Sequence, residues 1–159
     1  MYFCKNYFLC SKSFFKLLPH EQLIIEYFSG PVSWYDLVEM KRREVAEPNY
    51  NPNFNVITDI REAIVNLDAL DDVESYIDFL KSNQKSIGTR KTAILTNNSE
   101  QVIHSELLRV MKRDLPINIK TVSTYNAVFE WVELLPKVAQ QIETYLDNLT
   151  TEFYLVSTN

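Results

Sequence analysis

Glycine, histidine and cysteine are scarce in this sequence, and each scarcity excludes a kind of site. The 159 residues include two Gly, two His and two Cys. Two glycines are too few for a Gly-rich loop around a phosphate group. Two histidines leave little material for a multi-His metal site. Cys4 and Cys10 have no nearby His, so they do not form a zinc pattern, and nothing resembles a disulfide framework. We therefore expect neither a bound metal nor a cofactor.

Excess positive charge and long apolar runs are also missing. Lys and Arg total 16 against 21 Asp and Glu, which gives a net charge of −5. A nucleic-acid-binding surface must neutralise phosphates, so this balance argues against such a partner. The densest basic run, residues 41–43, falls in the second half of an expected helix, where the helix dipole favours cations. No segment approaches the ~18 apolar residues of a membrane span. We therefore expect a soluble, cytoplasmic protein without nucleic-acid partners.

The hydrophobic pattern predicts one α/β domain in residues 1–135. Two apolar segments with a short polar connection indicate an antiparallel hairpin, and a helix follows with Ser33 as its N-cap. Three strand–helix units come next, the arrangement typical of parallel strands with right-handed crossovers. The expected strands are residues 11–18, 22–29, 55–60, 92–96 and 117–122. The expected helices are residues 33–47, 71–86, one that runs through Met111 with Ser99 as its N-cap, and one that runs through Val132 with Ser123 as its N-cap.

Residues 136–159 form a separate C-terminal segment. Val138, Ile142, Tyr145 and Leu149 recur at helical spacing, which predicts an amphipathic helix. This helix either packs on its own domain or forms a homodimer contact. The apolar tail, residues 150–159, either adds to a sheet edge or is disordered.

After the opening hairpin, the chain contains in this order the segments GPVSW (30–34), NVITDIRE (55–62), TAILT (92–96) and NAVFEWVEL (126–134). These segments and the order of the elements resemble the bacterial SpoIIAA-like family, which is related to STAS domains and similar in fold to lipid-carrying CRAL-TRIO (SEC14) domains. The resemblance covers about residues 12–134. It implies a mixed sheet with helices packed mainly on one face and no known enzymatic activity.

The resemblance suggests two roles, and the sequence departs from one of them. Anti-sigma-factor antagonists of the STAS type switch partners through a phosphorylatable Ser in an Asp-Ser-Ser-Gly segment. Residues 67–72 of this chain read LDALDD, without that Ser or the Gly. Three carboxylates there would repel a phosphate. A STAS-like interaction module without this switch stays open, and so does carriage of an apolar molecule, as the CRAL-TRIO likeness suggests.

Asp59 and Arg61 are a charged pair that could belong to a binding site. Ligands bind beyond the carboxyl ends of parallel strands in open α/β sheets, and Asp59 falls at such an end. Strand alternation places both side chains on the same face. They form either a structural pair or an anchor for a ligand.

The aromatic content of 13% leaves room for an apolar pocket as well as for ordinary core packing. We expect such a pocket between the sheet and the helix over residues 71–86. Its walls would be Phe28, Trp34, Ile77 and Leu80, with Asp59 or Arg61 at its mouth. No nucleophile, base and oxyanion donor are positioned together by the sequence, so no catalytic residues are expected. We therefore expect a non-enzymatic domain that binds a small apolar or lipid-like molecule, or alternatively docks a protein partner.

Overall fold

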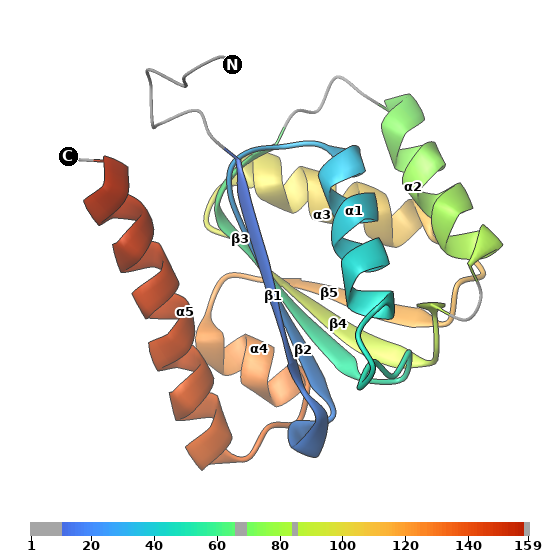
Figure 1. Ribbon diagram of the computed structural model, residues 1–159. Coiled ribbons are helices and arrows are strands. Elements are labelled where there is room, and N and C mark those ends of the chain that lie inside the picture. The colour runs from blue at the N-terminus through green and yellow to red at the C-terminus, as the bar shows by residue number, and fades with distance from the viewer. Residues whose placement is uncertain (1–10, 66–69, 84–85, 158–159) are drawn as a thin grey trace.

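Five strands form one mixed sheet in the computed structural model of the chain, which describes residues 11–65, 70–83 and 86–157 (Figure 1). The spatial order follows the sequence order. The first two strands are antiparallel, and every later neighbour is parallel. This confirms the predicted α/β class and the antiparallel first hairpin. The strands are β1 (Lys12–Leu18), β2 (Leu23–Val32), β3 (Asn55–Val65), β4 (Arg90–Leu95) and β5 (Ile117–Val122).

Helices cover both faces of this sheet. Figure 1 shows α1 (Trp34–Val45), α2 (Leu70–Ser82) and α3 (Ser99–Met111) on one side of the sheet. It shows α4 (Tyr125–Trp131) and α5 (Pro136–Ser157) on the other side. A short 3₁₀ turn, η2 (Pro19–Glu21), joins β1 to β2.

The two faces have separate apolar cores because strand side chains alternate between them. Along β2, Leu23, Ile25 and Tyr27 pack with α4 and α5, whereas Ile24 and Phe28 pack on the other side. On the side of α4 and α5, Ile142 and Leu146 of α5 are buried in the core. The C-terminal helix therefore packs on the sheet of its own chain.

The helix starts follow local capping chemistry. Ser33 accepts from the backbone of Asp36, and Asp36 accepts from the backbone of Ser33, which completes a capping box at the predicted N-cap of α1. The other two predicted caps are each wrong by one residue. Asn98 caps α3 instead of Ser99, and Thr124 caps α4 instead of Ser123. In both cases, the capping side chain comes directly before the first helical residue.

Two strands and one helix are longer than the sequence predicts. β2 continues through Pro31 to Val32 and pairs with the end of β3, which itself extends to Val65. α5 continues to Ser157 and takes up most of the tail that was predicted to join a sheet edge or to be disordered. The first half of the LDALDD segment, residues 67–69, lies outside the described residues, and its second half begins α2. No helix within the described ranges is both long and apolar enough to cross a bilayer.

Candidate functional site

A cavity of about 70 Å³ lies between the sheet and the helices α1, α2 and α3. Most of its lining is apolar. Charged side chains also line it: Glu26 from β2, Lys41 from α1, Arg90 from β4, and Lys112 just after α3. The apolar lining includes Trp34, Leu37, Ile60, Leu80, Leu108 and Ile117.

Lys41 lies between two buried carboxylates at one end of this cavity. Its ammonium group donates to Glu26, and it donates to Glu44 Oε2 at 2.9 Å. The other oxygen of Glu26 accepts from the Thr58 hydroxyl at 2.6 Å. Glu26 faces this side because it alternates with Ile25 and Tyr27 on β2, and Lys41 follows Leu37 by one helical turn. The cluster joins β2, β3 and α1 through charged hydrogen bonds.

The two carboxylates around Lys41 differ in their affinity for a proton. Burial raises the pKa of Glu44 to about 8, and the nearby charge of Glu26 adds to that rise against the attraction of Lys41. Burial also acts to raise the pKa of Glu26, but the charge of Lys41 and hydrogen bonds from Glu44, Lys41 and Thr58 outweigh it and lower that pKa. The pKa of Lys41 is raised, because both carboxylates outweigh its burial. At neutral pH, the cluster therefore contains an ammonium, an ionised Glu26 and a protonated Glu44.

Arg90 is a buried cation that no carboxylate neutralises within the described ranges. Its residue is 4% exposed, and its Nε has no hydrogen-bond partner among the residues that the structure describes. Its Nη1 lies 3.4 Å from the Tyr50 hydroxyl, which itself donates to the Ser86 carbonyl at 2.7 Å. An incompletely paired buried guanidinium is costly, so its position beside a cavity marks a candidate binding group.

Aromatic rings form part of the cavity wall. The Trp34 ring stacks on the His104 ring with centroids 4.3 Å apart, and on the Tyr76 ring at 5.6 Å. Burial lowers the pKa of His104, which favours the neutral form of the imidazole. Trp34 Nε1 and His104 Nδ1 are buried, and neither has a partner among the described residues. The wall therefore offers unused polar atoms beside a largely apolar space.

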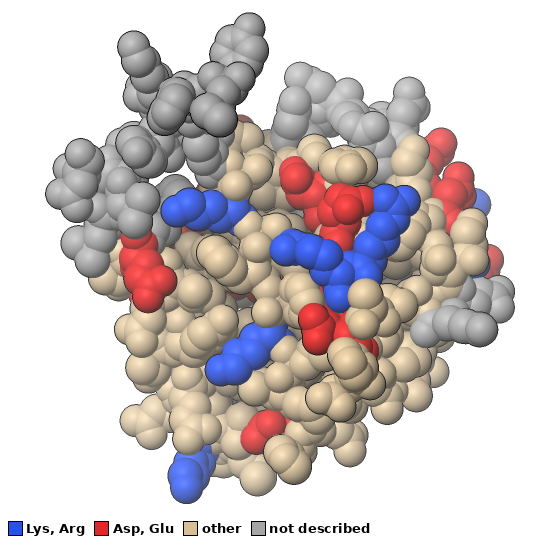
Figure 2. All heavy atoms as spheres, viewed as in Figure 1, with Lys and Arg blue, Asp and Glu red and all other residues tan. Residues whose placement is uncertain are grey.

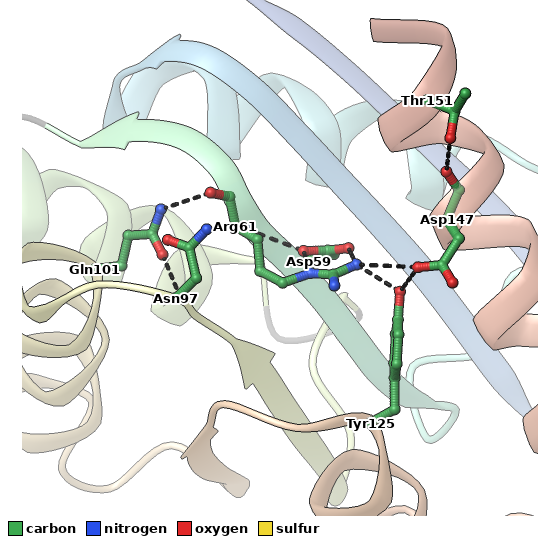
Figure 3. A network of polar contacts seen from close by, with 7 residues as sticks. All are labelled: Asp59, Arg61, Asn97, Gln101, Tyr125, Asp147 and Thr151. Atoms are coloured by element: carbon green, nitrogen blue, oxygen red, sulfur yellow. Dashed lines mark hydrogen bonds and ion pairs between the residues drawn. The ribbon is translucent and has the colours of Figure 1, made fainter. Parts of the chain in front are cut away.

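Asp59 and Arg61 form a second polar cluster on the opposite face of the sheet (Figure 3). Arg61 Nε donates to Asp59 Oδ1 at 3.0 Å, and Arg61 Nη2 donates to Oδ2 at 2.9 Å. The same Nη2 donates to the Tyr125 hydroxyl at 2.5 Å, and that hydroxyl donates to Asp147 Oδ1 at 2.6 Å. The guanidinium also lies over the Tyr125 ring. This cluster links β3 to α4 and α5.

The same β3 segment is held from the other direction by α3. Gln101 donates to the backbone carbonyls of Arg61 and Ala63, and it accepts from the backbone of Asn97 (Figure 3). The described contacts of Asp59 and Arg61 are thus those of a structural pair that joins several elements. These contacts satisfy both oxygens of the buried carboxylate.

The structure separates the six predicted ligand-binding residues into three groups. Trp34 and Leu80 line the cavity. Phe28 and Ile77 are buried on the same side of the sheet but are not part of its lining. Asp59 and Arg61 do not lie at its mouth, because Thr58 and Ile60 point toward the cavity and the alternating residues point away. The prediction that Asp59 or Arg61 lies at the mouth of the pocket is therefore wrong.

The four charged residues that line the cavity were not predicted as site residues from the sequence. Glu26 interrupts an otherwise apolar strand, and Lys41 lies one helical turn after Leu37 on the inner face of α1. Opposite charges on two buried faces are a signal for a buried ion pair. Arg90 precedes the predicted start of its strand, so no pattern indicated that it would be buried.

The outer face of α1 carries its charges in a mixed arrangement. Figure 2 shows basic and acidic side chains next to one another over this helix. Arg42 pairs with Glu39, and Arg43 donates to the Ser13 hydroxyl at 2.9 Å. Lys41 of the basic run points inward. The run at residues 41–43 therefore does not form a uniformly basic patch.

A solved structure with a similar fold is that of an uncharacterized protein from the DUF3478 family, with a SpoIIAA-like fold, from Shewanella loihica PV-4. The two chains are 14% identical, the likeness covers 77% of this chain and 93% of that chain, and the TM-score is 0.49. No family model and no curated protein matches the sequence. The likeness is to the fold that the sequence resemblance implies, and it carries no argument about function.

Proposed function

We propose that this chain is a non-enzymatic binding domain whose cavity between the sheet and α1–α3 takes a small, largely apolar molecule. The observation that carries this proposal is the combination of apolar walls with buried polar atoms, on Trp34, His104 and Arg90, that have no hydrogen-bond partner in the described part of the chain. Ligand sites are mostly apolar with a few polar groups that orient the ligand. Native cores pair most of their buried polar atoms, so several unpaired ones beside one cavity favour an occupant.

The volume of the cavity limits the size of that occupant. An apolar cavity of about 150 Å³ holds a benzene molecule, and one water takes about 30 Å³ in the liquid. The cavity here, at about 70 Å³, is roughly half the first volume. It suits a ligand of a few heavy atoms. A long lipid chain would require α2 or α3 to move away from the sheet.

The polar groups around the cavity support binding without chemistry. Ser105 donates its hydroxyl to the Gln101 carbonyl at 2.8 Å, so within the described part of the chain no base activates it. The raised pKa of Lys41 keeps it an ammonium, which is not a nucleophile. Docking of a protein partner, as a STAS-like module would do, and homodimer formation stay predictions.

Xenon-pressurised ¹H–¹⁵N NMR of the full chain tests the proposal. Xenon enters small apolar cavities whatever the charge at their rim. We expect saturable shifts at lining residues such as Leu80, Ile94 and Ile117. Leu108→Phe should weaken these shifts by filling the space, whereas Leu107→Phe, a neighbouring partly buried residue outside the lining, should leave them. Absence of any saturable shift at the lining residues would overturn the proposed function.

A further inference from the structure

The cavity carries an excess of positive charge. Three described cations line it, Lys41, Arg90 and Lys112, against the single carboxylate of Glu26. Glu44 lies behind Lys41 and bonds to it rather than to Arg90 or Lys112. Even with both carboxylates ionised, the cations outnumber them. A small enclosed space of this kind favours an anionic occupant, because low-dielectric surroundings screen charge poorly.

The excess lies on Arg90 and Lys112, because Lys41 is already paired twice. Arg90 has no salt-bridge partner within the described residues, and the recorded contact of its guanidinium is the long one to Tyr50. Lys112 is half-buried and reaches the Leu115 carbonyl at 3.5 Å. A guanidinium offers two parallel N–H donors, which match the two oxygens of a carboxylate. A carboxylate at Arg90 would supply the missing charge and hydrogen bonds together.

The surroundings of Arg90 indicate what the rest of the ligand is made of. Arg90 is the first residue of β4 and lies opposite Ile117, the first residue of β5. Leu80 and Ile117 line the same cavity and are buried. A bare inorganic anion would leave this apolar wall without contacts. A short hydrocarbon body would cover it and would be stabilised by the apolar surface that it removes from water.

We propose that the cavity takes a short-chain monocarboxylate, with its carboxylate on Arg90 and its hydrocarbon body against Leu80 and Ile117. This inference rests on the proposed binding function and adds the chemical class of the ligand. The occupant is smaller than benzene, which favours chains of about two to four carbons. Lys112 attracts the anion, and Arg90 fixes its orientation.

The test compares three probes of nearly equal shape on the full chain: propionate, propionamide and propylamine. Chemical-shift titration should show propionate binding at least about tenfold more tightly than propionamide, with propylamine not binding. Shifts should centre on Arg90, Leu80 and Ile117. Equal or weaker binding of propionate relative to propionamide would overturn the inference. Inorganic phosphate that competes as well as propionate would do the same, because the apolar body would then be irrelevant.

Variants locate the binding group. Arg90→Met should reduce propionate affinity by about tenfold or more and should reduce propionamide affinity by a smaller factor, because the neutral carbonyl loses a hydrogen bond but no ionic attraction. Lys91→Met is the matched control, because Lys91 pairs with Glu133 and lies over Trp131, on the other face of the sheet. Should Arg90→Met fail to fold, Lys112→Met serves instead, with an expected loss of severalfold. Propionate binding that Lys112→Met leaves unchanged would then count against the inference.

The xenon experiment separates the two proposals. If xenon enters the cavity but propionate binds no more tightly than propionamide, the proposed function stands and the inference of a carboxylate ligand is overturned. If xenon produces no saturable shift, the proposed function is overturned, whatever propionate does elsewhere on the chain.

Discussion

Arg61 donates two hydrogen bonds to the carboxylate of Asp59, two residues earlier on β3: Nε to Oδ1 at 3.0 Å and Nη2 to Oδ2 at 2.9 Å. The carboxylate is fully buried, whereas the Arg61 side chain is 21% exposed. The pair extends through Tyr125 to Asp147 on α5. A charge pair in the middle of β3, where the sequence predicted a strand end, thereby links the sheet to two helices that lie much later in the sequence.

Removing the cation should destabilise the fold. Arg61→Met leaves Asp59 buried without its charged partner, and we expect the free energy of unfolding to fall by about 3 kcal/mol. Urea unfolding monitored by circular dichroism measures this. Arg109→Met is the control, since Arg109 pairs with Glu106 on an exposed helix face and should cost less than about 1 kcal/mol. Equal losses in the two variants would contradict a structural role for the Asp59–Arg61 pair.

The hydroxyl of Tyr125 connects the pair to α5, and its removal should loosen that helix. Tyr125→Phe keeps the stacked contact with Phe129 but deletes the bridge between Arg61 and Asp147. We expect a loss of about 1–2 kcal/mol, typical of a hydrogen bond to a charged group. Amide hydrogen exchange in α5 should be faster in the variant than in the parent chain, whereas exchange in α1 should be the same in both. Exchange in α5 that is unchanged by the substitution would show that its apolar contacts alone hold it.

Those apolar contacts give a separate prediction. Leu146 is fully buried between α5 and the sheet, so Leu146→Ala should reduce stability by about 2–5 kcal/mol. Leu135→Ala is the control, because Leu135 is 73% exposed and should change stability by less than about 0.5 kcal/mol. Thermal and urea unfolding measure both. A negligible effect of Leu146→Ala would mean that α5 does not pack on the sheet in solution.

The order and type of the elements were predictable because strand and helix periods are local. The ends of the strands were less so. Gly30 and Pro31 are stop signals, yet β2 continues through them beside β3. Pro31 lies beyond Lys12–Ser29, the last pair that β1 makes with β2 in the described residues. A missing N–H is tolerated where a strand has one neighbour. That pairing is a long-range property, which local residues do not show.

The candidate site was predictable only in part for a related reason. Alternation correctly placed Asp59 and Arg61 on one face of β3, and Trp34 and Leu80 of the expected pocket both line the cavity. Which face each set occupies depends on how later helices divide between the two sides of the sheet. The burial of Arg90 depends on the same division. Neither periodicity nor residue type carries that information.

The Lys41 cluster gives a prediction about pH. In the folded chain, the pKa of Glu44 is raised from its ordinary value of 4.5 to about 8, chiefly by burial. Unfolding between these values releases a proton, so the stability contribution of Glu44 is full below about pH 4.5 and is lost as the pH rises through about 8. The slope from this group is at most about 1.4 kcal/mol per pH unit.

Glu44→Gln isolates this effect, since a neutral amide replaces a carboxyl that is already protonated. We expect the variant to match the parent chain near pH 5 and to become relatively more stable toward pH 8. The lowered pKa of Glu26 acts in the opposite direction and mainly below its ordinary value of 4.5. The lowered pKa of His104 acts below its ordinary value of 6.5 and is common to both chains. Urea unfolding of both chains at pH 5, 6, 7 and 8 measures the difference, and parallel curves would show that Glu44 does not hold a proton in the folded chain.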